Sequence, residues 1–540
     1  MLLTGVFTEF MMDVAVLVQP QAMKVRSDIA PAKPKSLFQT GFKFDSKTTL
    51  NTKISLITMK LMKKLSFLWL ALLMLVAKGS SFTTSLNTKS LPRATSLKLL
   101  QDTRHVPKAV RLMEQRLSSS NSRNLQITCM GDLVHNACAN CCGYKFTNKV
   151  ALTAAINGYP GNTLTYGGMD CWDVGNITDM SELFSLKSTF NQQIGCWNVS
   201  KVTTMYKMFW KAYRFNQTLG NWDVSRVTNM ASMFYQATDF NQDIGNWNVI
   251  SVIDMTEMFW DASSFNQVIR NWNVSRVTIM SYLFAGTVKF NQAIGNWNVS
   301  SVTTMYKMFW KAYRFNQTLG DWDVSRVTDM KEMFWGAYDF NQDIGNWNVS
   351  GVTTMHGLFS DTYNFNQVIS NWNVSKVTLM GSMFATSKFD QAIGNWDVSK
   401  VTYMGAMFYQ ARAFNQTIGN WNVSSVTDMN QMFFRAEKFN HAMGNWNVSR
   451  VTTMLRMFAD ATNFNQNIGN WDVGKVANMN EMFSMTTNFN QDLCLWHNKL
   501  KTLPTATNMF FGSGCTNKAT PNVTSKTSFC QACTCTAGKF

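Results

Sequence analysis

The stretch FNQTLGNWDVSRVTNMASMFYQATD, residues 215–239, recurs with few changes over more than half of this 540-residue chain. With its Phe as position 1, each turn reads F-N-Q-x-I-G-N-W-[ND]-V-S-x-V-T-x-M-x-x-M-F-x-x-A-x-x. A fixed period of this kind is typical of repeat proteins, in which neighbouring units share one continuous core. Tryptophan marks the turns at a spacing of 25, with one step of 24: residues 172, 197, 222, 247, 272, 297, 322, 347, 372, 396, 421, 446, 471 and 496.

Two apolar periodicities share each turn. Positions 5, 8 and 10 (Ile, Trp, Val) follow the inward alternation of a short strand. Positions 13, 16, 19, 20 and 23 (Val, Met, Met, Phe, Ala) fall at three- and four-residue steps, like one face of a helix, and Thr at position 14 is its candidate N-cap. We therefore predict an α/β repeat solenoid, like a leucine-rich repeat, of about fourteen turns, each with a short parallel strand and a short helix. The Met and aromatic columns, with Phe at position 1, are expected to form its core rather than a cofactor site.

The repeat resembles that of a known family. The phrase FNQDIGNWNVS-x-VTTM, present from Phe340, and its near copies from Cys171 to about Trp496 are similar to the repeats of BspA-type leucine-rich-repeat surface proteins. This resemblance implies an exposed or secreted protein, adhesion or ligand binding, and no catalytic residues. Bacterial relatives are often lipoproteins, but no cysteine follows the apolar run of the leader here, so lipid anchoring is not expected.

Charge and histidine content argue against two function classes. The net charge is +17, but residues 1–150 hold 21 Lys and Arg against 7 Asp and Glu, and the remaining residues hold 28 against 25. The array therefore lacks the basic face that a nucleic-acid backbone requires. Its histidines are scattered, and no motif places a nucleophile beside a base. We expect no enzyme activity, no cofactor and no metal site.

The N-terminal part reads as a targeting region. Residues 1–58 are expected to be an over-extended gene model or a disordered leader, and residues 59–79 a signal peptide, because Lys63 and Lys64 precede the apolar run LSFLWLALLMLVA. The alternative is a signal anchor that stays in the membrane. Residues 80–128 are expected to be a linker. The acid-free, hydroxyl-rich part of this linker also fits a two-part plastid targeting signal, which is the alternative to secretion or cell-surface display.

Cysteines gather at the two ends of the array, which predicts disulfide-rich caps. An N-terminal cap is expected over residues 129–170, the solenoid over 171–495, and a C-terminal cap with a shortened Cys-rich tail over 496–540. Cys171 and Cys196 share position 7 of consecutive turns, about 4.8 Å apart, so we predict a bond between them. Zinc is the alternative for the other clusters, but their spacing fits no common ligand set.

A capping helix is expected over residues 146–157. Thr147 is its candidate N-cap, and Val150, Ala151, Ala154 and Ala155 are expected on one side. The sequence NGYPGN then ends the helix.

The strand face offers a candidate binding surface. Position 9 is Asn or Asp and is expected to point outward beside the buried Trp, so its column suits sugar hydroxyls, although a structural ladder of hydrogen bonds is the alternative. Trp residues at position 21 offer either stacking platforms for sugars or contacts with the next turn. The position-9 candidates are Asn198, Asp223, Asn248, Asn273, Asn298, Asp323, Asn348, Asn373, Asp397, Asn422 and Asn447.

Many Asn-x-Ser/Thr sequons lie in the array, with Asn216, Asn316 and Asn415 as glycosylation candidates outside position 9. The main hypothesis is a secreted or cell-surface, non-catalytic protein that binds a protein or glycan ligand through its repeats. The alternative is a structural component of a wall or extracellular matrix that self-associates.

Overall fold

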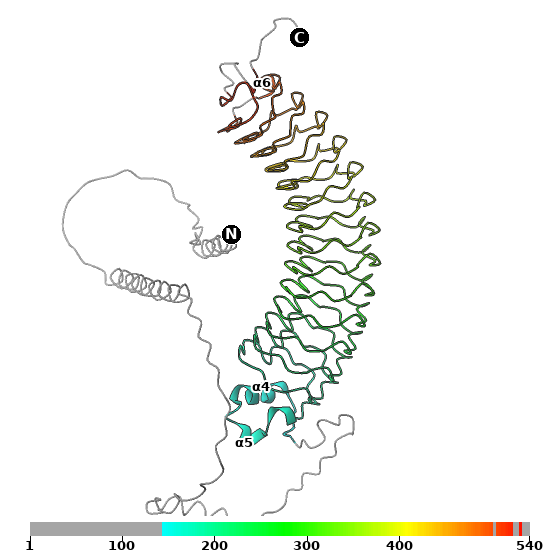
Figure 1. Ribbon diagram of the computed structural model, residues 1–540. Helices are drawn as coiled ribbons and strands as arrows, with labels where there is room; N and C mark the ends of the chain where they lie inside the picture. The colour runs from blue at the N-terminus through cyan, green and yellow to red at the C-terminus, as the bar shows by residue number, and fades with distance from the viewer. Residues whose placement is uncertain (1–142, 501–503, 522–528, 532–540) are drawn as a thin grey trace, which may run out of the picture. The chain divides into compact units, whose positions relative to one another are not determined.

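The computed structural model describes residues 143–500, 504–521 and 529–531. These residues belong to one compact unit, Ser122–Phe540. The expected leader, signal peptide and linker lie outside the described residues, as do Cys129, Cys138, Cys141, Cys142, Cys533 and Cys535. Figure 1 shows the repeats stacked turn upon turn, from α4 (Lys149–Gly158) at one end to α6 (Trp496–Lys499) at the other.

The expected core is confirmed. The repeating Ile, Trp, Val, Met and Phe side chains of successive turns are buried in one continuous hydrophobic cluster. Like side chains stack on like: the rings of Trp247 and Trp272 are nearly parallel at 6.3 Å, and those of Phe209 and Phe234 at 5.4 Å. Each buried Trp from Trp197 to Trp496 donates its indole N–H to a backbone carbonyl of the preceding turn, as Trp247 does to Leu219 at 2.9 Å. Burial therefore leaves no indole N–H in this column unsatisfied.

The expected strand and helix are not found in the repeats. The described turns contain neither an α-helix nor an extended strand, and parallel pairing between them is confined to isolated bridges at position 15, such as Asp329 with Thr354. Positions 16 to 23 form overlapping tight turns instead, in which Met333 donates to Met330 and Trp335 to Glu332. The solenoid is therefore built from turns.

Backbone hydrogen bonding explains why no helix forms. The N–H groups at positions 16, 18, 20 and 22 donate to carbonyls of the next turn, as Phe334 does to Leu358 at 3.0 Å, so they are not available to a helix. This alternation requires left-handed residues at positions 18 and 22, with φ of 56° at Glu332 and 72° at Gly336. Such non-glycine residues are strained locally, and the continuous inter-turn bonding holds them in place.

The N-terminal helix differs from expectation in its cap and its buried face. Helix α4 begins after Asn148, not Thr147, because the Asn148 side chain accepts the Ala151 N–H at 2.9 Å. Leu152, Ala155 and Ile156 are its buried residues, whereas Val150 is 80% exposed. The shorter elements α5 (Thr163–Tyr166) and η1 (Met169–Cys171) then lead into the first turn.

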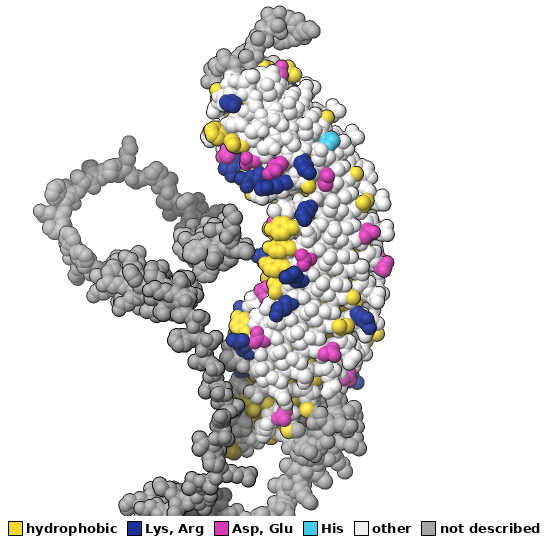
Figure 2. All heavy atoms as spheres, viewed as in Figure 1, with side chains coloured by type: hydrophobic (Ala, Val, Ile, Leu, Met, Phe, Trp, Pro, Cys, Tyr) yellow, Lys and Arg dark blue, Asp and Glu magenta, His cyan; other side chains and the backbone are white. Residues whose placement is uncertain are grey.

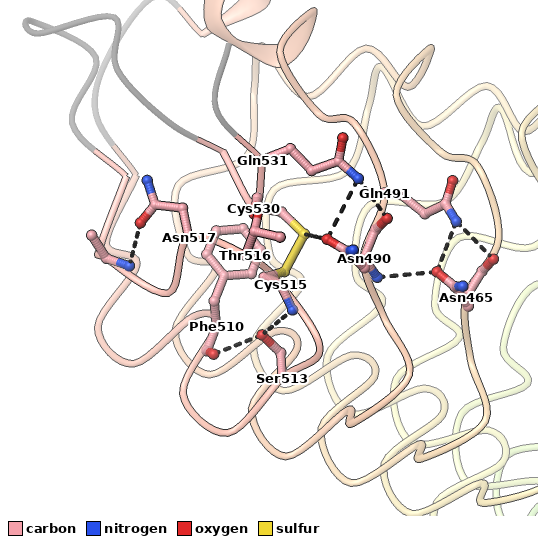
Figure 3. Close-up of a disulfide and its surroundings, with 11 residues drawn as sticks. Asn465, Asn490, Gln491, Phe510, Ser513, Cys515, Thr516, Asn517, Cys530 and Gln531 are labelled. Atoms are coloured by element: carbon pink, nitrogen blue, oxygen red, sulfur yellow. Dashed lines mark hydrogen bonds between the residues drawn. A yellow bond between two sulfur atoms is a disulfide. The ribbon is translucent and has the colours of Figure 1, made fainter.

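The stacking continues beyond residue 495. Asn478 pairs with Thr505, and Met509 and Phe510 enter the core as the Met and Phe of earlier turns do. Figure 3 shows how the tail closes this end, with Cys515 and Cys530 joined by a disulfide. None of the helices in the described part of the chain has the length and apolar run that a membrane crossing requires.

Candidate ligand-binding surfaces

The position-9 side chains are exposed and bond within their own turn. In each of the eleven predicted residues the side-chain oxygen accepts the backbone N–H two residues later, at 3.0 to 3.3 Å. At Asn198 and Asn348 the Ser hydroxyl two residues on also donates, at 2.7 Å. These are Asx turns, in which the side chain stabilises the local backbone.

These Asx-turn hydrogen bonds lower the pKa of two carboxylates in the column. Hydrogen bonds from the Ser325 hydroxyl and N–H hold the pKa of Asp323 below its ordinary value, and Ser399 does the same for Asp397. Among the described residues no group of three or more His, Cys, Asp or Glu side chains is placed to hold a metal ion. The column therefore presents local turn caps, and its role in binding stays a prediction.

A hydrogen-bonded ladder runs along the array at position 2, which the sequence analysis missed. Each side-chain oxygen from Asn191 to Asn465 accepts the backbone N–H of position 2 in the next turn, at 2.8 to 3.3 Å. In most turns the Gln at position 3 adds a second donor, as Gln367 does to Asn341 at 3.0 Å. The repeated F-N-Q triplet was the available sequence signal.

This ladder includes the three glycosylation candidates. The Asn216, Asn316 and Asn415 side-chain oxygens are ladder acceptors. An N-linked glycan is attached to the side-chain nitrogen, which takes no part in these ladder bonds. Asn415 is exposed, whereas Asn216 and Asn316 are half-buried. Glycosylation at these positions stays a prediction.

Disulfides are present at both ends of the described array. Cys171, Cys196 and Cys494 are disulfide-bonded, as are Cys515 and Cys530. The structure shows Cys515 bonded to Cys530. It does not show the expected bond between Cys171 and Cys196, whose pairing stays a prediction.

Aromatic and lysine side chains form a second, lateral surface. Trp210 stacks on Tyr235 at 5.6 Å, and Trp260 contacts Tyr235 and Tyr282 at 5.2 and 4.2 Å. These rings therefore pack against neighbouring turns, yet they remain half-buried. We define the aromatic–lysine surface by the residues Tyr206, Lys207, Trp210, Lys211, Tyr235, Trp260, Tyr282, Tyr306, Lys307, Trp310 and Lys311.

Lysines lie over the rings at both ends of this surface. The Lys211 ammonium is 4.3 Å from the Trp210 ring centroid, and Lys311 is 4.4 Å from that of Trp310. Lys307 also pairs at 3.1 Å with Glu332, a buried carboxylate beneath the surface. Figure 2 shows hydrophobic and charged side chains gathered along one edge of the array, while most of the visible face is neither.

The chain is a tandem-repeat solenoid with a continuous aromatic and methionine core. It belongs to the family described as Mycoplasma protein of unknown function, DUF285, whose model matches residues 155–271, 264–363, 336–439 and 413–523. No curated protein and no solved structure matches the chain.

Proposed function

We infer that this chain is a secreted or cell-surface, non-catalytic protein that binds a protein or glycan ligand through the aromatic–lysine surface. The observation that supports this inference most directly is the surface's duplication. Residues 203–220 and 303–320 are identical, TTMYKMFWKAYRFNQTLG, including side chains that the core does not constrain. Two copies of one Tyr-Lys-Trp-Lys arrangement thus lie four turns apart, which suits a bivalent contact with an extended or repeating ligand.

The chemistry of the surface fits recognition rather than catalysis. Half-buried aromatic rings offer apolar contact area at low entropic cost, and the flanking lysines add hydrogen-bond donors and charge. Position 9, the earlier candidate, consists of side chains that already stabilise local turns. Binding is therefore assigned to the lateral surface, and the position-9 column provides matched controls.

The test compares two double variants of the full-length secreted chain on a glycan array and on intact cells. Trp210→Ala with Trp310→Ala removes both copies of the aromatic contact and is expected to abolish binding. Asn348→Ala with Asn373→Ala changes the position-9 column and is expected to leave binding intact. Circular dichroism and light scattering confirm that each variant is folded and show its assembly state.

The opposite pattern, loss of binding only in the asparagine variant, would place the ligand on the position-9 column. Absence of binding together with concentration-dependent self-association of the unmodified chain would support the structural wall or matrix alternative.

A further inference from the structure

The position-2 ladder has a distinctive first turn. From Asn216 onward, every position-2 N–H donates to an Asn or Asp side chain of the preceding turn, as Asn216 does to Asn191 at 2.9 Å. Asn191 itself follows Tyr166 and Gly167, which stand where an earlier turn would carry Asn and Gln. In the described hydrogen bonds, neither the Asn191 N–H nor the Gln192 side-chain amide has an acceptor.

These donors border a pocket of about 400 Å³ at the N-terminal end of the array. Such a volume lies within the ~300–1,000 Å³ range of small-molecule sites. The walls are mostly polar and include Tyr159, Asp170, Asn191, Gln192, Gln193 and Gln217. Asp170 is exposed, and it accepts no hydrogen bond among the described residues. The pocket therefore combines amide donors, a carboxylate acceptor and one aromatic ring.

This combination selects a chemical class of ligand. Asp170 disfavours an anion, because a second negative charge nearby would be repelled. A hydroxyl both donates and accepts, so neighbouring hydroxyls of one sugar ring satisfy Asp170 and the Gln192 amide together. Tyr159 adds a ring against which an apolar sugar face can pack. A neutral polyol matches the donors and acceptors better than an acid or an apolar molecule does.

We propose that this pocket binds a neutral monosaccharide unit, either free or at the end of a glycan. The pocket borders Asn191 and Gln192, positions 2 and 3 of the turn 190–214, whereas the aromatic–lysine surface begins at position 17 of that turn with Tyr206 and continues along later turns. The proposal does not depend on the proposed function, and either can fail without the other.

The experiment is isothermal titration of the full-length chain with glucose, mannose, galactose and N-acetylglucosamine, with glucuronate as the anionic comparison. We expect at least one neutral sugar to bind and glucuronate not to bind. Gln192→Ala and Asp170→Asn should each weaken that binding about tenfold, the effect of losing one ligand hydrogen bond in a polar site. Neither change should lower the melting temperature, since neither side chain has a described hydrogen-bond partner.

Gln367→Ala is the matched control, because Gln367 occupies the same repeat position in the interior and donates to the Asn341 side chain. It should lower stability slightly and leave sugar binding unchanged. The proposal is overturned if none of the neutral sugars binds, if glucuronate binds equally well, or if binding survives both pocket variants. In each of these cases the tryptophan double variant still tests the lateral surface separately.

Discussion

The asparagine at position 2 has a structural role that its polarity alone does not reveal. Its side-chain oxygen accepts up to two hydrogen bonds from the next turn, from a backbone N–H and a glutamine amide. A typical intramolecular hydrogen bond contributes about 0.5–1.5 kcal/mol, and an unsatisfied buried donor costs about 1–3 kcal/mol. The same kind of acceptor, repeated along the ladder from Asn191 to Asn465, therefore contributes cumulatively to the stability of the stack.

Asn341→Ala should lower the free energy of unfolding by about 1–2 kcal/mol, because the Asn366 N–H and the Gln367 amide lose their shared acceptor. Asn341→Asp should cost less, since Asp390 fills the same position and accepts the Asn415 N–H at 2.8 Å. Chemical denaturation of the two variants checks this order. Equal losses in both would show that the acceptor oxygen is not what matters.

Left-handed residues are the second residue-scale feature. Positions 18 and 22 have positive φ in every turn, and glycine stands there at residues 286, 336, 357 and 512. Elsewhere these positions are filled mainly by polar or charged residues. The sequence alone therefore did not reveal that they are left-handed. A left-handed site favours glycine because other residues meet steric strain there.

At the scale of one turn, the sequence predicted which side chains are buried but not the backbone that buries them. Positions 16, 19, 20 and 23 point inward as expected, and a helix would give the same spacing. Consecutive tight turns with alternate N–H groups directed to the next turn give it too. Periodicity alone does not distinguish these backbones, because the deciding contacts are between neighbouring turns, as between Phe334 and Leu358, which are 24 residues apart.

The sequence predicted exposure at the candidate sites but not their contacts, because those contacts join residues of neighbouring turns. Exposure of position 9 followed from its place beside the buried Trp and was correct. The packing of Trp210 on Tyr235 depends on inter-turn register, so two interpretations of the position-21 tryptophans stayed open. The pocket at Asp170 and Gln192 required knowing that position 2 forms a ladder with a first member.

The C-terminal segment that holds Cys515, Cys530 and Gln531 closes the last turns, and we call it the clasp. Gln531 donates to the Asn490 carbonyl at 2.8 Å, in the way that Gln491 donates to that of Asn465 (Figure 3). The Cys515–Cys530 bond closes a span of 15 residues, and a loop of this size contributes about 3 kcal/mol in the chain-entropy model. Gln531 of the clasp therefore makes with Asn490 the contact that the glutamine of the next repeat makes elsewhere in the array.

Replacing both cysteines, with Cys515→Ser and Cys530→Ser, should loosen the end of the array and leave the middle unchanged. The Phe483 and Met485 N–H groups donate to the Met509 and Phe511 carbonyls, so their hydrogen exchange should accelerate. Exchange at Phe334, far from the clasp, serves as the internal control. Unchanged exchange at Phe483 and Met485 would show that the clasp does not hold the last turns.

At the scale of the whole molecule, the turns form a linear stack, and both the core contacts and the candidate binding surfaces run along it. Each turn contacts mainly its neighbours, so a surface can be duplicated with its block of turns without disturbing the rest. The identical segments 203–220 and 303–320 have this form. Both binding proposals depend on the same register between turns, one through ring stacking and the other through the start of the ladder.

Residue-resolved hydrogen exchange on the full-length chain tests that register most directly. The account predicts slow exchange at Met330, Glu332 and Phe334, whose N–H groups donate to the next turn, and fast exchange at Asp329, for which the described residues provide no backbone acceptor. Slow exchange at Met330 beside fast exchange at Asp329, repeated every 25 residues, would support the turn-built solenoid. Fast exchange at Met330, with protection that begins only at Glu332, would instead indicate a helix capped by Thr328, because the first N–H groups of a helix lack intrahelical acceptors, and it would contradict the account.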